Sequence, residues 1–137
     1  MKKQVEVVAA IIFNDDKKIF LAQRSYGDLK DTWEFPGGKV EQGETNEEAL
    51  VREIKEELNS TIKVEKFFDT VTYEYPTFII KLNCYICKLI EGRLTIDEAI
   101  HEGCKFVEIN NLLKEDLAPA DYIIANKIKD TYKETTL

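Results

Sequence analysis

Residues 38–60 place acidic and apolar side chains in separate sectors of one predicted helix. Glu53, Glu56 and Glu57 are spaced i, i+3 and i+4, so they share one helix face. The apolar side chains of this segment fall in another sector and are expected to face a core: Leu50, Val51, Ile54 and Leu58. Three carboxylates on one face repel one another, so that face either is well solvated or binds a cation. The chain must bury one side of this helix and leave the acidic side open.

The ends of this helix are marked by capping residues. Thr45 followed by Glu48 forms a capping box, which predicts that the helix starts at Thr45. It is expected to end near Leu58, with Asn59 in the left-handed conformation of a C-terminal cap.

Two local features place the acidic face next to a turn. The loop Pro36-Gly37-Gly38 precedes the helix, and its backbone carbonyls are open to close approach because glycine has no side chain. Arg52 lies four residues from both Glu48 and Glu56, so we expect it to pair with both and to orient Glu56.

The remaining residues predict one α/β domain spanning residues 1–137, a length suited to a single core. Apolar and β-branched runs predict strands at 5–13, 19–24, 61–75, 78–89 and 105–109, the third and fourth as a long antiparallel pair. A closing helix is predicted over residues 119–132. The pattern indicates a mixed sheet covered by helices.

Charge and hydropathy exclude several classes of protein. A net charge of −7 argues against binding a nucleic-acid polymer, whereas an acidic protein with a polyphosphate substrate needs a cation between them. The sequence has no run of eighteen apolar residues and no apolar leader, so we expect a cytoplasmic protein without a membrane span. The three cysteines are expected to be reduced, and Cys84 and Cys87 to point to opposite faces of a strand.

The spacing around the helix resembles the signature of a known superfamily. Gly38, then Glu44, then the run Arg52-Glu53-Ile54-x-Glu56-Glu57 is similar to the Nudix box. Asn59 and Ser60 depart from it, where a glycine and an aliphatic residue are usual, which puts the helix exit in question. The segments 7–12, 21–24, 33–39 and 117–121 are similar to the MutT-like branch, especially its CTP pyrophosphohydrolase and 8-oxo-dGTP diphosphatase members.

The resemblance implies a fold and a reaction. It implies an α/β/α sandwich with a mixed central sheet, and hydrolysis of a nucleoside triphosphate to monophosphate and pyrophosphate by water that attacks phosphorus. The cofactor would be Mg²⁺, with Mn²⁺ as an alternative. The metal ligands would be Gly38, Glu53, Glu56 and Glu57. Arg52 would orient them, Glu53 is either ligand or general base, and Glu44 is expected to play a supporting part.

A second acidic residue is expected on the loop 97–103, before the last strand. The position at which the resemblance implies an acid holds Ile100, flanked by Glu98 and Glu102. Both are candidates for the general base, with Glu102 preferred. His101, the only histidine, is expected to be a surface or hydrogen-bonded loop residue.

Candidate substrate-binding residues lie outside the box. Phe35 is expected to stack on the base or to belong to the core, Arg24 to contact ribose or base, and Lys39 to reach phosphate. Asp121 stands where sanitising MutT-like enzymes have an asparagine that reads an oxidised guanine, unless it only caps the closing helix. An ionised aspartate would favour the amine of cytosine, whereas a protonated one would reverse that inference.

Three readings of function therefore remain. The first is a triphosphate pyrophosphohydrolase that acts on (d)CTP-type or oxidised nucleotides such as 8-oxo-dGTP, as a monomer or homodimer. The second is a hydrolase of nucleotide sugars or dinucleoside polyphosphates, and the third a non-catalytic nucleotide-binding module. The intact set of three glutamates favours an enzyme over the third reading.

Overall fold

The computed structural model describes residues 2–96 and 100–132. The strands are β1 (Lys3–Phe13), β2 (Ile19–Arg24), β3 (Trp33–Glu34), β4 (Gly37–Lys39), β5 (Thr61–Glu74), β6 (Phe78–Glu91) and β7 (His101–Val107). The helices are α1 (Asn46–Leu58), the 3-10 helix η1 (Ile109–Lys114) and α2 (Pro119–Tyr132). The strands form one sheet in the order β3-β2-β1-β6-β5, to which β4 adds on β1 and β7 on β2.

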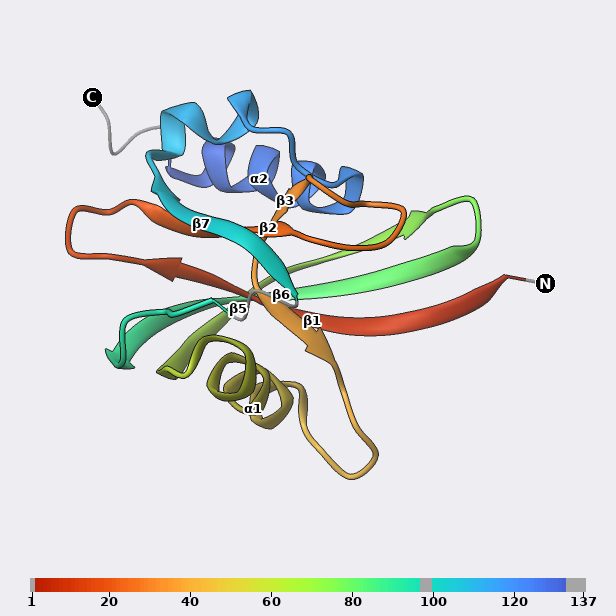
Figure 1. The fold of residues 1–137 in the computed structure, drawn as a ribbon, viewed down its shortest axis with the longest axis horizontal. Helices are drawn as coiled ribbons and strands as arrows, with labels where there is room; N and C mark the ends of the chain where they lie inside the picture. The colour runs from red at the N-terminus through yellow and green to blue at the C-terminus, as the bar shows by residue number, and fades with distance from the viewer. Residues whose placement is uncertain (1, 97–99, 133–137) are drawn as a thin grey trace.

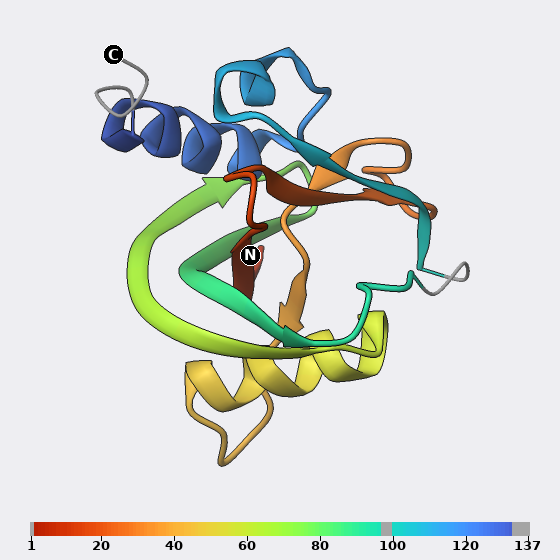
Figure 2. The same ribbon diagram turned by 90° about the vertical axis from the view of Figure 1, so that its left-hand side faces the viewer.

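The sheet lies between two helical layers. Helix α1 lies on one side and α2 with η1 on the other (Figure 1). The sheet is mixed because β1 runs parallel to β6 and antiparallel to β2 and β4. Figure 2 shows the long β5–β6 hairpin bending from the α2 layer to the α1 layer. This arrangement confirms the α/β/α sandwich expected from the sequence.

Strand β1 separates the two apolar cores. Ala9 and Ile11 belong to the core on the α2 side, while Val8, Ala10 and Ile12 belong to the core on the α1 side. This alternation follows from the two-residue period of a strand, and it explains why the whole run is apolar. Cys84 and Cys87 of β6 likewise fall in opposite cores, as predicted.

Helix α1 has the caps that the sequence predicts. The Glu48 N–H donates to Thr45 Oγ1 (3.1 Å), and the Thr45 N–H donates to Glu48 Oε1 (2.9 Å). Asn59 is left-handed (φ 48°) and closes the helix. The fully buried residues are Ala49, Leu50, Ile54 and Leu58, so the apolar stripe holds the helix against the sheet.

The unusual residues at the helix exit are accommodated by a buried hydroxyl. Ser60 Oγ donates to the Leu58 carbonyl (2.9 Å) and accepts from the Leu94 N–H (2.8 Å). A side chain on Gly92 would overlap Ser60, so the neighbouring turn is shaped around this serine. The departure at Asn59 and Ser60 therefore leaves the helix intact.

The predicted boundaries were wrong around the last strand and the glycine loop. Strand β7 covers His101–Val107 instead of 105–109, so residues 101–103 of the expected loop are strand. It extends because residues from His101 to Val107 pair with β2, from Arg24 to Ile19. Residues 33–34 and 37–39 also form short strands, held by β2 and β1. These strands form through pairing with other segments of the chain, so the residues of each strand carry no local sequence pattern that predicts it.

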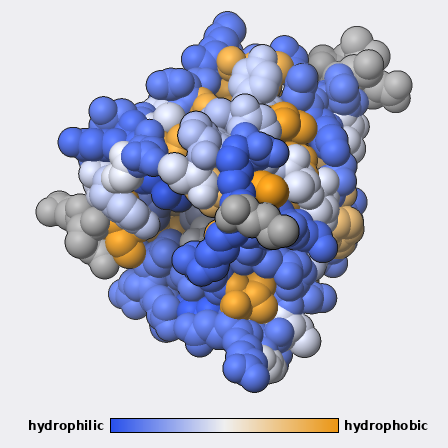
Figure 3. All heavy atoms as spheres, turned by 90° about the vertical axis from the view of Figure 1, so that its right-hand side faces the viewer, coloured by the Kyte–Doolittle hydropathy of each residue, from blue (hydrophilic) through white to orange (hydrophobic). Residues whose placement is uncertain are grey.

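The surface view in Figure 3 is mainly hydrophilic, with small hydrophobic areas separated by polar and charged side chains. Neither α-helix in the described residues has the length and apolar character that a membrane span requires.

Candidate functional site

A cavity of about 730 Å³ brings most of the predicted site residues together. Seven of them line it: Arg24, Phe35, Gly38, Lys39, Glu53, Glu57 and Asp121. Its wall also includes apolar side chains of β1, of β6 and of the turn between β5 and β6, among them Val7, Tyr75, Phe78 and Ile80. Arg52, Glu56 and Glu102 do not line it.

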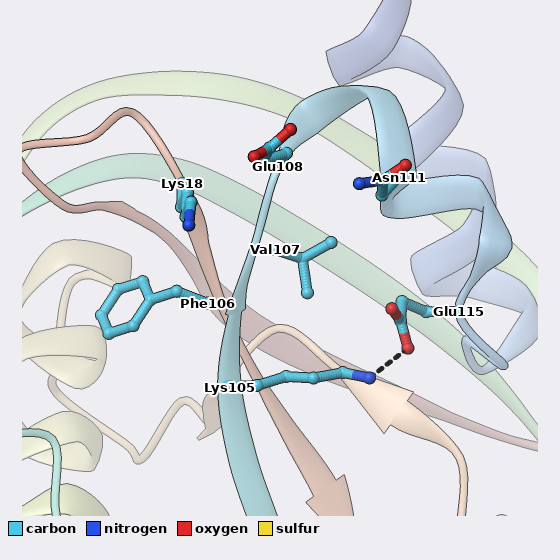
Figure 4. A pocket seen from close by; sticks show the side chains of 7 residues that line it. All are labelled: Lys18, Lys105, Phe106, Val107, Glu108, Asn111 and Glu115. Atoms are coloured by element: carbon cyan, nitrogen blue, oxygen red, sulfur yellow. Dashed lines mark ion pairs between the residues drawn. The ribbon is translucent and has the colours of Figure 1, made fainter.

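A second hollow, of about 240 Å³, lies beside β7 and η1 (Figure 4). It contains none of the predicted site residues. Lys105 Nζ pairs there with Glu115 (2.5 Å) and lies 4.2 Å from the centroid of the Trp33 ring, so its charge is already engaged. The larger cavity is therefore the candidate site.

Glu53 and Glu57 form a pair of carboxyl groups at one end of the cavity. They are one helical turn apart, and their side chains are hydrogen-bonded to each other. Burial, the neighbouring Glu53 carboxyl group and the charge of Glu34 together raise the pKa of Glu57 to about 8, with burial the largest cause. In the protein alone, the pair therefore tends to share a proton.

Gly38 lies directly against Glu53. A β-carbon at position 38 would overlap the Glu53 carboxyl group, and one at Gly37 would overlap the backbone carbonyl of Val8. Gly37 is therefore needed for β4 to pair with β1, and Gly38 leaves room for the Glu53 carboxylate.

Arg52 organises the acidic helix face, and its predicted contact with Glu56 is present. Its guanidinium contacts both carboxyl oxygens of Glu44, Nε to Oε2 (2.7 Å) and Nη2 to Oε1 (2.9 Å). Its Nη1 donates to Glu53 (2.9 Å) and Glu56 (3.2 Å). The hydrogen bond from Arg52 holds the pKa of Glu44 below its usual value. The predicted pairing with Glu48 was wrong, because the Glu48 side chain completes the helix cap.

The carboxylate pair has the chemistry of a site for a hard divalent cation. All of its donor atoms are oxygens, and a cation would relieve the repulsion that now raises the pKa of Glu57. In the described part of the chain, no three acidic, histidine or cysteine side chains already converge on one point. Glu56 is 60% exposed and is held by Arg52, away from the cavity.

Asp121 lies at another part of the cavity wall, in the first turn of α2. It is 7% exposed, and its Oδ2 accepts a hydrogen bond from the Phe35 N–H (3.0 Å). Burial raises the pKa of Asp121 to about 8, and the charge of Glu34 acts in the same direction. Near neutral pH the side chain is therefore mainly a carboxylic acid, which both donates and accepts hydrogen bonds. Phe35 itself is 3% exposed and belongs to the core.

The start of α2 is fixed to the cavity by two contacts. Trp33 and Leu117 form a bridge, with the Ala118 N–H donating to the Trp33 carbonyl (3.1 Å). Tyr75 Oη accepts the Ala120 N–H (3.1 Å), which satisfies one free donor of the helix N-terminus. Asp121 is thereby brought next to β3.

The raised pKa of Asp121 predicts a pH dependence of stability. The native state keeps a proton between the usual pKa of 3.8 and about 8, so the free energy of unfolding should fall as pH rises through this range. One such group contributes a slope of up to about 1.4 kcal/mol per pH unit. Asp121→Asn should reduce the slope, which urea unfolding between pH 5 and 8 in chelator would measure. An unchanged slope would show that Asp121 is ionised in the native protein.

The structure adds Glu34, which the sequence had not singled out, to the candidate site, and it places His101 in contact with Glu34. Glu34 Oε1 accepts hydrogen bonds from Arg24 Nε (3.2 Å) and Nη2 (2.9 Å), while Glu34 Oε2 contacts His101 Nε2 (3.2 Å). Glu34 lines the cavity and His101 lies behind it. His101 was expected on a loop but is on a strand and 1% exposed. Glu34 lay inside the motif at 33–39, the only signal that could have drawn attention to it.

Glu102, the acidic candidate of the former loop that lies in the described residues, is not brought to the cavity. Glu102 lies at a register shift between β2 and β7, and its carboxylate is 3.9 Å from Lys30 Nζ. A hydrogen bond with Asp31 raises the pKa of Glu102. Glu98 lies outside the described residues. Of residues 100–103, the described part of this segment, Ile100 lines the cavity.

Comparison with known proteins gives a consistent result. The sequence profile of the NUDIX domain matches residues 3–127. The chain is 43% identical over 86 residues to an 8-oxo-dGTP diphosphatase of Haemophilus influenzae, a match that covers 62% of this chain and 63% of that relative. It is 40% identical over 120 residues to a CTP pyrophosphohydrolase of Escherichia coli, covering 87% of each. The solution structure of a MutT protein from Staphylococcus aureus superposes with a TM-score of 0.76 at 44% identity, over 96% of this chain and 99% of that one.

Proposed function

The chain belongs to the Nudix hydrolase family, and from this premise we propose that it is a Mg²⁺-dependent nucleoside triphosphate pyrophosphohydrolase acting on cytidine-type or oxidised nucleotides. The observation that carries the proposal is that the Glu53–Glu57 pair and Asp121 line the same cavity. One wall offers oxygen ligands for a metal, and another offers a neutral donor–acceptor group for a base.

The acidic end of the cavity suits the polyphosphate. Glu53 and Glu57 would hold the metal together with the Gly38 carbonyl, and Glu56 would join them on leaving Arg52. When bound, Mg²⁺ neutralises charge on the phosphates and lowers the pKa of a coordinated water. Arg52 keeps Glu53 in place through the contact at 2.9 Å. Lys39 lines the same cavity and supplies a mobile positive charge for a phosphate oxygen.

The Asp121 wall suits the base. As a carboxylic acid, Asp121 can donate one hydrogen bond and accept another, which matches the N3 and amine edge of cytosine and the donor–acceptor edge of an oxidised guanine. An ionised carboxylate would accept only. The protonated form therefore supports both candidate classes and removes the preference for the cytosine amine alone.

A turnover panel tests the proposal. Wild-type protein with Mg²⁺ should release pyrophosphate and the monophosphate from one or more of dCTP, 5-methyl-dCTP, CTP and 8-oxo-dGTP, at least about 100-fold faster than from dGTP. Chelation of the metal should stop the reaction. Absence of turnover with every nucleotide would refute the proposal, and release of inorganic phosphate in place of pyrophosphate would refute the stated bond cleavage.

Substitutions at Glu56 and Asp121 test which residues bind the metal and which recognise the base. Glu56→Gln should be strongly impaired, and full activity would remove Glu56 from the metal-binding set. Asp121→Asn keeps a neutral donor–acceptor group, whereas Asp121→Leu does not, so only the leucine variant should lose discrimination between bases. Equal base preference in wild type and Asp121→Leu would exclude Asp121 from base recognition.

A further inference from the structure

His101 is a buried polar side chain that satisfies only one of its two ring nitrogens in the part of the chain that the structure describes. Its side chain is 1% exposed, and its Nε2 contacts Glu34 Oε2 at 3.2 Å. Its Nδ1 is also buried and has no hydrogen-bond partner within residues 2–96 and 100–132. A half-satisfied imidazole costs stability that an apolar side chain of similar size would not. Within the described residues, the contact with Glu34 is therefore the one hydrogen bond that the His101 side chain makes.

That hydrogen bond completes the support of Glu34. Each oxygen of the Glu34 carboxylate has its own partner, since Arg24 donates to Oε1 and His101 to Oε2. The three residues come from β3, β2 and β7, and Arg24 and His101 are direct partners in the β2–β7 pairing. Glu34 is only 15% exposed, so its carboxylate is fixed from both sides.

Glu34 and Arg24 line the same cavity as Glu57 and Asp121. The charge of Glu34 acts on both Glu57 and Asp121, because it contributes to the raised pKa of each. Glu34 also directly precedes Phe35, whose N–H binds Asp121. In a nucleotide the sugar directly follows the base, so a base held at Asp121 would bring the sugar to the part of the cavity wall that Glu34 and Arg24 line.

We propose that His101 is a positioning residue for the sugar of the substrate: it holds the Glu34 carboxylate, and so fixes the Glu34–Arg24 pair against which the sugar lies. This inference rests on the proposed function. His101 does not line the cavity, so it acts through Glu34. Without the imidazole donor, Oε2 of Glu34 loses its partner and the carboxylate can rotate. Because every candidate substrate carries a pentose between its base and its phosphates, the effect must be independent of the base.

Steady-state kinetics with two variants test the proposal. His101→Leu removes the donor, whereas the amide nitrogen of His101→Gln can replace Nε2. The leucine variant should raise KM about tenfold for every nucleotide, with kcat changed less than about twofold. The glutamine variant should keep KM within about twofold of wild type. An unchanged KM, an effect confined to one base, or equal defects in both variants would overturn the proposal.

Two additions keep the test decisive. If His101→Leu does not fold, His101→Asn takes its place, because its shorter amide retains polarity but does not reach Glu34. Binding of dCMP in chelator, followed by ¹H–¹⁵N NMR titration, requires neither metal nor turnover. Here the leucine variant should bind about tenfold more weakly than wild type. Equal affinity, or no binding by wild type, would overturn the inference. If no triphosphate is turned over, this titration still decides it separately from the proposed function.

Discussion

Glu57→Gln is expected to lower kcat/KM with Mg²⁺ by about 10³-fold, because the metal loses a charged ligand worth about 4 kcal/mol of transition-state stabilisation. Glutamine has nearly the same shape as glutamate, so the packing of α1 should not change. Pyrophosphate release under single-turnover conditions would measure the effect on the chemical step.

The same variant should respond in the opposite direction when stability is measured without metal. Burial and the charge of Glu53 raise the pKa of Glu57 to about 8, so wild type loses stability as pH rises from the usual carboxyl range towards 8. A neutral amide removes that loss, and the variant should be more stable than wild type in chelator at pH 8. Added Mg²⁺ should raise the Tm of wild type and leave that of Glu57→Gln unchanged. A variant that retained full activity, or gained the same Tm shift with Mg²⁺, would contradict the metal assignment.

Gly38→Ala should abolish most activity while leaving the fold stable. The added methyl group would overlap the Glu53 carboxyl group, the free end of a flexible side chain that can move aside. The free energy of unfolding should therefore change by less than about 1 kcal/mol. A carboxylate displaced by about 1 Å is expected to cost about 100-fold in kcat/KM. Turnover and urea unfolding of one preparation measure both quantities.

Two other glycines serve as matched controls. Gly37→Ala places its methyl group against the Val8 carbonyl, which is backbone and cannot move aside, so it should cost about 3 kcal/mol of stability. Gly103→Ala meets no atom closer than 3.9 Å and should change neither stability nor activity. If Gly38→Ala were as active as Gly103→Ala, the space beside Glu53 would have no catalytic importance.

The sequence predicted α1 well because each of its signals is local. Thr45 and Glu48 are three residues apart, and a helix alone brings them into contact. The same holds for Arg52 and Glu56, whose predicted contact is present at 3.2 Å. The local argument was wrong for Glu48 because two partners competed for its carboxylate, and the cap prevailed.

The sequence predicted the strands that have long apolar or β-branched runs. It missed the strands that form only because a neighbouring strand pairs with them. The runs that form β1, β2, β5 and β6 are evident without a structure. The short strand β3 exists because Ala22 and Gln23 of β2 pair with it. The early start of β7 at His101 depends on its pairing with Arg24, 77 residues earlier in the chain. No window of sequence contains both partners.

The sequence by itself determined the acidic helix, its apolar back and the resemblance to the Nudix box, since these depend on spacings within a few helical turns. Only the tertiary structure turned Glu56 away from the cavity and raised the pKa of Asp121 by burying it. It also joined Arg24, Glu34 and His101. Phe35 and Asp121 meet across 86 residues, and His101 and Glu34 across 67. Such contacts follow from strand register and from the docking of α2. Protonation in turn depends on burial and neighbouring charge, which exist only in the folded chain.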